Sequence, residues 1–179
     1  MALTATLYTF DVALSDVDRG VYESLSIKAA CHPSESDDYF ATRVLAYALE
    51  YTDGIAFSKG ISEPDVPAIT VRDLTGALKS WIEIGAPDAA RLHKASKASP
   101  RVAVYTHKEP RIFLRAYEGE RIHRSEALEL YAMDREMLAA FVQRLDRRVK
   151  LAMTVTDGQL FLDYGGDTIT GTVQRLTLA

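Results

Sequence analysis

Residues 63–85 read Glu63-Pro-Asp-Val-Pro-Ala-Ile-Thr-Val-Arg-Asp-Leu-Thr-Gly-Ala-Leu-Lys-Ser-Trp-Ile-Glu-Ile-Gly85, and this segment contains the clearest fold signal in the chain. It holds two runs of β-forming residues, 68–72 and 77–84, on either side of Asp73-Leu-Thr-Gly76, which has the residue types of a turn. The pattern therefore predicts a β-hairpin in which Asp65 and Glu83 come to the same end.

Upstream of this hairpin, the sequence predicts a helix over residues 34–51. Ser34 is a good N-cap, and Asp37 stands three residues later in the place of a capping-box acid. Apolar side chains then recur at helical spacing: Phe40, Val44, Tyr47, Ala48 and Tyr51. Asp53-Gly54 ends the helix, and residues 55–57 are a short apolar segment that is expected to begin a sheet.

Downstream of the hairpin, Pro87 is a favoured first-turn residue for a helix that ends near Ser99-Pro100. Residues 102–105 form a short apolar run, which indicates a buried strand. From residue 34 onward the predicted order is therefore α-β-β-β-α-β. The fold class is α/β (α+β) with a mixed sheet.

Both flanks of this core are rich in strand signals. Residues 3–14 and 21–30 are β-forming runs joined by a turn-forming cluster, so an opening hairpin is expected, with Leu25, Ile27 and Ala29 on one face. Residues 111–122 fit a helix and a strand equally, 127–132 indicate a strand, and 134–147 indicate a helix with Asp134 as N-cap. Alternation over 149–155 leads into the hairpin signal Asp157-Gly158, and strands are expected at 160–164 and 168–178.

The composition is that of an ordinary globular protein, with 179 residues, 47% hydrophobic and 26% charged, and we expect one domain over residues 1–179. The first residues do not resemble a signal peptide, and no stretch reaches the ~20 apolar residues of a membrane span. The single cysteine, Cys31, suits a reducing compartment, so a cytoplasmic protein is expected. A monomer fits the sequence, which does not fix the oligomeric state.

The charge balance bears on possible partners. The formal net charge is -4 and the pI is near 5.6, which weighs against a high-affinity, nonspecific nucleic-acid binder. A nuclease is still compatible with this charge, because it needs only a local basic lining near its carboxylates.

Three acidic residues stand where helices or strands meet loops: Glu35 near the start of the first helix, and Asp65 and Glu83 at one end of the hairpin. Two converging carboxylates are what Mg²⁺ requires, since it is bound by one or two carboxylates together with water and phosphate. Such an ion activates water and neutralises charge on a phosphodiester. Asp65 and Glu83 are therefore the candidate metal ligands.

Cations follow on the next helix. Lys94 can position the attacking water or stabilise developing negative charge, and Arg91 lies one turn before it on the same face. Lys97 and Arg101 are further candidates for phosphate contacts, and Arg91 joins them in this role.

Several motifs, taken in order and spacing, resemble the YaeQ family over essentially the whole chain. They are Met1-Ala-Leu-Thr-Ala-Thr6, His32-Pro-Ser-Glu35, Glu63-Pro-Asp65, Asp73-Leu-Thr-Gly76, Trp81-Ile-Glu-Ile-Gly85, and Pro87-Asp88 with Arg91 and Lys94-Ala95. The resemblance implies a variant of the PD-(D/E)xK nuclease core over about residues 34–106. In that core Asp65 is the acid of the Pro-Asp pair, Glu83 the acid of the second motif, and Glu35 the helix acid.

The resemblance implies a Mg²⁺- or Mn²⁺-dependent nuclease or phosphodiesterase, a hydrolase that acts on nucleic acid. The lysine expected two residues after Glu83 is Gly85 in this chain, so the catalytic ammonium is expected to have moved to Lys94. The alternative is a noncatalytic nuclease-like module that binds nucleic acid or a protein partner.

Each candidate residue also has a purely structural interpretation. Glu35 can stabilise a helix N-terminus, Asp65 can be a turn residue after proline, and Glu83 can be a paired acid in an apolar strand. Cys31 and His32 are adjacent on a strand and point to opposite faces, so a structural thiol is favoured over a nucleophile and base pair. His32 can still orient Glu35.

Overall fold

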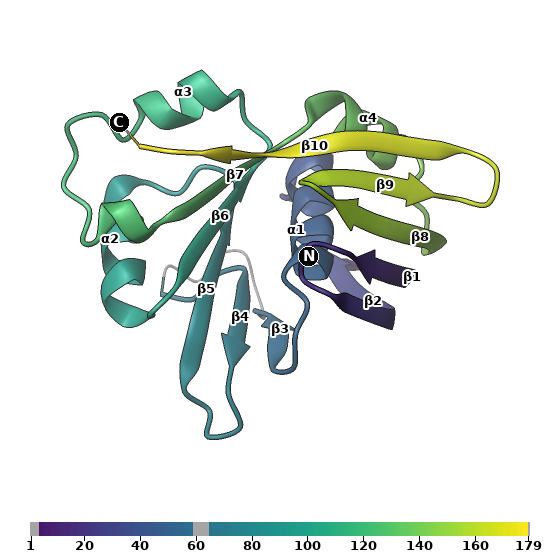
Figure 1. Ribbon diagram of the computed structural model, residues 1–179, viewed down its shortest axis with the longest axis horizontal. Coiled ribbons are helices and arrows are strands. Elements are labelled where there is room, and N and C mark those ends of the chain that lie inside the picture. The colour runs from purple at the N-terminus through teal and green to yellow at the C-terminus, as the bar shows by residue number, and fades with distance from the viewer. Residues whose placement is uncertain (1–3, 59–64, 179) are drawn as a thin grey trace. The chain divides into compact units, whose positions relative to one another are not determined.

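The computed structural model describes residues 4–58 and 65–178, which form two compact units (Figure 1). Unit 1 comprises Met1–Leu49 and Met133–Gln174, and unit 2 comprises Glu50–Ala132 and Arg175–Ala179. The sequence patterns do not indicate this division, and the single domain over residues 1–179 stays a prediction. The predicted strand start at Leu3 and the motif residues Glu63 and Pro64 lie outside the described residues.

Unit 1 is built on a sheet with the strand order β2-β1-β8-β9-β10. The strands are β1 (Thr6–Asp16), β2 (Val21–Cys31), β8 (Arg148–Thr156), β9 (Gln159–Asp163) and β10 (Thr168–Leu176). β1 and β8 are parallel, and the other neighbours are antiparallel. The opening hairpin is confirmed, and Leu25, Ile27 and Ala29 are buried as their alternation predicts.

Two helices of unit 1, α1 (Asp37–Leu49) and α4 (Arg135–Gln143), pack against each other. The ring of Phe10 on β1 lies 6.2 Å from that of Phe40 on α1 and 6.1 Å from that of Phe141 on α4. All three side chains are fully buried, so aromatic packing joins the sheet to both helices.

The start of α1 corrects the prediction, because the helix begins at Asp37 and not at Ser34. The cap is Ser36, whose Oγ accepts a hydrogen bond from the Tyr39 amide at 3.1 Å. The Ser34 hydroxyl is instead 2.8 Å from Nδ1 of His32. Glu35 therefore precedes the helix and does not lie in its first turn.

The C-terminal elements of unit 1 form where the sequence predicts them, except at the end of α4. Asp134 caps α4, and its Oδ1 accepts from the Met137 amide at 2.8 Å. The helix ends at Gln143, four residues before the predicted end, because the Arg144 amide turns back to the carbonyl of Phe141. Asp157 and Gly158 have φ values of 51° and 74°, as a tight hairpin turn requires.

Unit 2 is built on a mixed sheet with the strand order β7-β6-β5-β4-β3. The strands are β3 (Ile55–Phe57), β4 (Ile69–Arg72), β5 (Leu78–Ile84), β6 (Val102–Thr106) and β7 (Glu129–Met133). The pairs β3–β4 and β4–β5 are antiparallel, and β5–β6 and β6–β7 are parallel. With α2 (Ala89–Ala98), the element order from α1 to β6 is α-β-β-β-α-β, as predicted.

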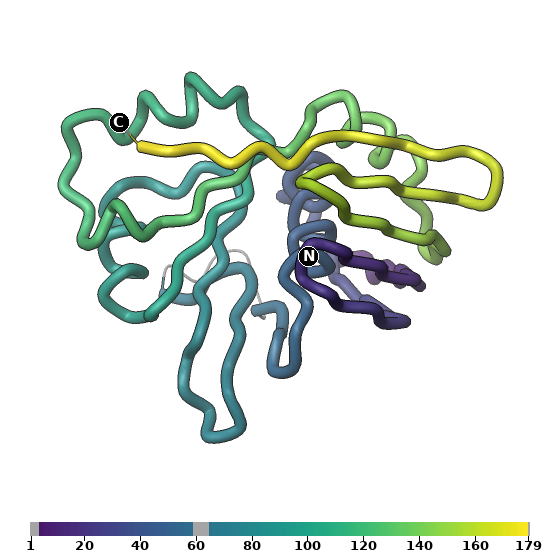
Figure 2. Tube along the Cα trace, in the orientation of Figure 1, coloured from purple at the N-terminus to yellow at the C-terminus, as the bar shows by residue number. Residues whose placement is uncertain are grey.

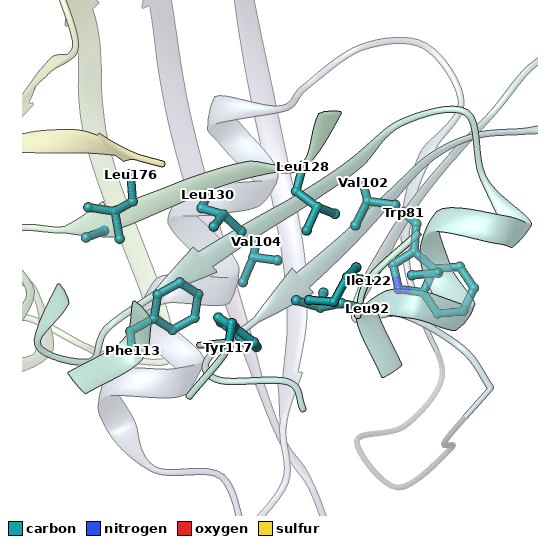
Figure 3. Close-up of a cluster of buried hydrophobic side chains, with 12 residues drawn as sticks. Trp81, Leu92, Val102, Val104, Phe113, Tyr117, Ile122, Leu128, Leu130 and Leu176 are labelled. Carbon is teal, nitrogen blue, oxygen red and sulfur yellow. The ribbon is translucent and has the colours of Figure 1, made fainter. Parts of the chain in front are cut away.

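One face of this sheet carries the core of unit 2 (Figure 3). Trp81, Val104 and Leu130 project from three neighbouring strands, and Leu92 of α2 packs with them. The ambiguous segment at 111–122 forms the short helix α3 (Pro110–Arg115) and then irregular chain, and a 3₁₀ turn (Ser125–Ala127) precedes β7. Phe113, Tyr117 and Ile122 from this segment close the core. None of the helices within the described residues is long and apolar enough to cross a membrane.

Gly54, at the start of unit 2, is a position where an added side chain is expected to destabilise the fold. An alanine Cβ at this position would lie 1.9 Å from the backbone oxygen of Arg72, at a φ of +88°. We expect Gly54→Ala to lower the free energy of unfolding by about 2 kcal/mol, measured by urea denaturation. Gly76→Ala is the control, because its φ is +86° but no described atom lies within 4 Å of the added Cβ. Equal losses of unfolding free energy in the two variants would show that the contact with the Arg72 backbone is not the cause.

Candidate functional site

Glu83 lies on β5 with only 5% of its surface exposed, and its carboxylate is fully engaged with neighbours. Nε1 of Trp81 donates to Oε1 at 2.7 Å, and Nε of Arg91 lies 2.9 Å from both carboxylate oxygens. Trp81 and Glu83 are two residues apart on one strand and so share the face that α2 covers. The acid in the apolar run is therefore both buried and paired.

Helix α2 supplies the cation for this pair. Its N-cap is Asp88, whose Oδ1 accepts from the Arg91 amide at 2.8 Å and so fixes the first turn of the helix. The Arg91 side chain also donates from Nη2 to the carbonyl of Val66 at 2.8 Å. Arg91 thus joins β5 to the segment that precedes β4.

Asp65 lies at the same end of the hairpin as Glu83, since the register pairs Ile69 with Ile82. Its exposed carboxylate accepts a hydrogen bond from Nζ of Lys94 on α2. The hydrogen bond from Lys94, and then its charge, lower the pKa of Asp65 below its ordinary value. We call Asp65, Glu83, Arg91 and Lys94 the α2 cluster.

The α2 cluster contains two carboxylates and two cations, so its formal charges cancel. Lys97 lies three residues after Lys94 on the same helix and is exposed to solvent. This lysine adds positive charge beside a cluster that is otherwise balanced.

The carboxylates of the α2 cluster fit a metal ion only if a phosphate group binds together with the metal. No group of three or more His, Cys, Asp or Glu side chains that could hold a metal occurs in residues 4–58 and 65–178. Mg²⁺ can nevertheless be held by one or two carboxylates with water and substrate phosphate. A divalent ion beside Glu83 would face the Arg91 guanidinium, and an anionic phosphate would offset the added charge. A metal held by Asp65 and Glu83 would therefore need a phosphate group bound with it, and the role of these two residues as metal ligands stays a prediction.

Glu35 belongs to unit 1, where its carboxylate is almost completely buried. Arg43 donates from Nη2 to Oε1 at 3.1 Å and from Nε to Oε2 at 3.2 Å. The backbone amide of His32, and not its ring, donates to Oε1 at 3.0 Å. These contacts hold the chain between β2 and α1, and the role of Glu35 as an assisting acid stays a prediction.

Cys31 ends β2 and is half-buried. Burial raises the pKa of its thiol, and the nearby Glu35 carboxylate raises it further. A raised pKa keeps the thiol protonated, so the structural role that the sequence favours for Cys31 fits these surroundings.

Arg101 is not available for phosphate contacts in the way that the sequence suggested. Its Nη1 lies 2.7 Å from Oε2 of Glu50, and its Nε lies 2.6 Å from Oε2 of Glu129. The Tyr105 hydroxyl also donates to Glu50 at 2.6 Å, and burial raises the pKa of Tyr105 well above its ordinary value. This carboxylate network had no local signal, because its members come from distant parts of the sequence.

Tyr117 is a second residue that the sequence did not indicate. Its hydroxyl donates to the carbonyl of Pro87 at 2.6 Å, immediately before the cap of α2. Burial raises the pKa of Tyr117, and the negative charge of Glu83 raises it further. Tyr117 therefore helps to fix the start of the helix that carries Arg91 and Lys94.

Comparison with known proteins gives a consistent result. The model of the YaeQ protein family matches residues 1–173. The YaeQ protein of Escherichia coli (strain K12) is 32% identical over 165 residues, which are 90% of each chain, and that of Salmonella typhi is 29% identical over 164 residues, also 90% of each chain.

Two crystal structures of YaeQ proteins resemble the fold. The protein from Pseudomonas syringae has a TM-score of 0.85 and 30% identity, with 98% of this chain and 97% of the other covered. The protein from Xanthomonas axonopodis pv. citri has a TM-score of 0.87 and 29% identity, with 98% and 100% covered. By sequence and by fold, the chain belongs to the YaeQ family.

Proposed function

We propose that this protein is a divalent-metal-dependent phosphodiesterase that acts on nucleic acid, with Asp65 and Glu83 as the metal ligands. The observation that carries the proposal is the α2 cluster, in which a buried carboxylate and an exposed one meet two cations of a single helix. The element order from α1 to β6 supports the likeness to a PD-(D/E)xK nuclease core.

Each residue of the α2 cluster has a distinct role in this proposal. A bound Mg²⁺ or Mn²⁺ would act as a Lewis acid on the phosphoryl oxygen and would lower the pKa of bound water. Lys94 leaves Asp65 and stabilises the negative charge that develops on the phosphate. Arg91 holds the Glu83 carboxylate in position, and Lys97 contacts a neighbouring phosphate.

The charge balance links the metal to its substrate. Because the α2 cluster is neutral by itself, a divalent ion alone would leave it with two positive charges in excess. A phosphodiester bound at the same time offsets part of this charge, so each ligand strengthens the binding of the other. The protein is thus expected to bind metal weakly until nucleic acid is present.

The distribution of charge between the units favours contact through unit 2. Unit 2 has 13 Lys and Arg against 12 Asp and Glu, whereas unit 1 has 8 against 13. The net negative charge of the chain therefore resides in unit 1, and the unit that carries α2 does not repel phosphate as a whole.

The second candidate function is a noncatalytic module that binds nucleic acid. It is favoured by the ion pairs that both carboxylates make with α2, and by Gly85 at the place where the nuclease pattern has lysine. In this case the cations of α2 contact phosphate and the carboxylates only hold the cations in position.

A cleavage assay separates the two functions. Plasmid, single-stranded DNA and RNA are incubated with Mn²⁺, Mg²⁺ or a chelator, and we expect metal-dependent cleavage by the unmodified chain. Asp65→Asn and Lys94→Gln are each expected to reduce the rate by roughly 100-fold, because a ligand or a charge-stabilising group is lost. Both residues are exposed, so the melting temperature should stay unchanged.

Lys28→Gln is the control, since it removes one exposed positive charge from β2 in unit 1. Cleavage that persists in both cluster variants would identify a contaminating nuclease. Binding of nucleic acid without any cleavage would establish the noncatalytic module in place of the enzyme.

A further inference from the structure

The turn between β4 and β5 presents one leucine entirely to solvent. The relative exposure of Leu74 is 107%, whereas the next most exposed large hydrophobic residue among those described, Ile112, reaches 65%. The hairpin that carries it extends away from the rest of the unit 2 sheet (Figure 2). A single exposed leucine is common on protein surfaces, so its significance depends on the turn that holds it.

This turn is held firmly by its own hydrogen bonds. Oδ1 of Asp73 accepts from the Thr75 amide at 2.9 Å, from the Thr75 hydroxyl at 2.5 Å and from the Ala77 amide at 3.0 Å. The Gly76 amide donates to the Asp73 carbonyl at 3.0 Å, and the φ of Gly76 is 86°. The backbone that carries Leu74 is therefore fixed before any partner arrives, which lowers the entropic cost of using this residue in binding.

Two cations flank the exposed leucine. Nη1 of Arg72 donates to the carbonyl of Gly76 at 3.1 Å, which holds the guanidinium at the turn. Nζ of Lys79 lies 3.7 Å from Oδ2 of Asp73, and 57% of the Lys79 side chain is exposed. With Asp73 as the one acid among these residues, the tip combines an apolar group with a net positive charge.

We propose that the β4–β5 turn is a wedge for a nucleic-acid duplex, with Leu74 inserted at a base step and Arg72 and Lys79 on the flanking phosphates. A two-stranded ribbon is narrow enough to enter a groove of the duplex, and proteins that bend DNA insert apolar side chains of this kind between base pairs. Arg72 and Lys79 supply the sequence-independent attraction to the backbone.

The choice of a duplex rests on the proposed function, because the same hairpin carries the α2 cluster at its other end. From the turn to Glu83 the strand spans roughly 25 Å, or about seven base pairs. A duplex of this length beside the β4–β5 hairpin would therefore reach from the wedge to the exposed Asp65 and Lys94 of the α2 cluster.

Other partners fit the tip less well. One leucine has too little apolar area to hold a protein on a bilayer, where stable anchoring takes a longer chain or several groups. A protein interface is expected to have a broad surface with buried aromatic or arginine anchors, which a two-stranded tip does not offer.

The test measures binding to a DNA duplex of about 30 base pairs that carries a fluorescent adenine analogue at a TA step, with a chelator present to prevent cleavage. Emission of the analogue rises when the base unstacks. We expect the unmodified chain to raise this emission, Leu74→Ala to abolish the rise and bind about tenfold more weakly, and Leu74→Met to retain both properties. Arg72→Gln and Lys79→Gln should each reduce the slope of log affinity against log salt by about one.

Ile112→Ala is the matched control, because it truncates another exposed apolar residue of unit 2. The inference is overturned if Leu74→Ala binds and unstacks the duplex as well as the unmodified chain does, or if the unmodified chain binds the duplex without raising the emission. It is also overturned if Leu74 is needed only for binding to phosphatidylserine vesicles. Cleavage that is independent of Leu74 would overturn the wedge proposal and leave the proposed enzymatic function standing. Leu74-dependent binding without cleavage would overturn the enzymatic function and leave the wedge proposal standing.

Discussion

Replacement of Glu83 by alanine is expected to lower the free energy of unfolding by about 3 kcal/mol. The change removes the carboxylate that accepts from Trp81 and Arg91, so a largely buried guanidinium loses its ion pair and a buried indole N–H loses its acceptor. Loss of an acceptor by buried donors costs more than the ion pair itself contributes. Urea denaturation of the unmodified chain and the variant, with equal slopes, measures the difference.

A double-mutant cycle isolates the ion pair from the rest of this effect. Glu83→Gln keeps an acceptor for Trp81 and removes only the charge, and Arg91→Met removes the guanidinium while keeping the bulk of the stem. The double variant should be more stable than the sum of the two single losses predicts. Additive losses would show that Glu83 and Arg91 do not stabilise each other, and the carboxylate would then need another explanation.

The expected instability of Glu83→Ala also limits the use of this variant in the cleavage assay. Loss of cleavage in Glu83→Ala would be expected from unfolding as well as from loss of a metal ligand. Glu83→Gln with a measured melting temperature is the more informative variant, because a folded and inactive protein assigns the loss to the missing charge. Asp65→Asn carries the same information without a buried partner.

Arg101→Ala is expected to lower the free energy of unfolding by about 4 kcal/mol at neutral pH. The arginine lies between Glu50 and Glu129, and its removal leaves two carboxylates facing each other with no cation between them. Arg148→Ala is the control, because Arg148 pairs with Asp11 in an exposed position and should cost less than about 1 kcal/mol.

Arg101→Ala is also expected to change how the stability of the protein responds to acid. Burial tends to raise the pKa of Glu129, but the hydrogen bonds from Arg101 and Tyr131 outweigh it and lower this pKa below its ordinary value. A lowered pKa in the folded state means that Glu129 contributes stability above its unfolded pKa, near 4.3, and loses it as the pH falls through the folded pKa.

In Arg101→Ala, Glu129 loses the Arg101 guanidinium but keeps Tyr131 and the more distant Arg175, so protonation of Glu129 weakens the variant less than it weakens the unmodified chain. The gap in stability between the two proteins should therefore narrow as the pH falls from 7 to below about 4. Urea midpoints measured across this range test the sign. A gap that stays constant or widens in acid would show that the Arg101 network does not act through charge.

The hairpin at residues 63–85 could be predicted because its signals are local. The turn residues Asp73 to Gly76 and the runs on either side fix the register, and the register brings Asp65 and Glu83 to one end. Arg91 was expected to contact phosphate, and its pairing with Glu83 was not predicted.

The remaining features depend on contacts that a linear pattern does not contain. Ser34 and Ser36 are equal as caps by residue type, and the ring of His32 decides between them by taking the Ser34 hydroxyl. Glu35 was placed in a helical turn, but Arg43 holds its carboxylate outside the helix. Arg101 looked like a phosphate ligand only because its two carboxylate partners are far away in the sequence.

The parallel pairing of β1 with β8 has a consequence for how the chain acquires its fold. Phe10 is matched with Val149, so the first hairpin leaves the ribosome long before the strand that covers its inner edge. Until then β1 has unpaired backbone groups, and pairings between such distant segments form slowly. Protein chains truncated before residue 148 are therefore expected to aggregate, and cotranslational chaperone contact should concentrate on the β1–β2 hairpin.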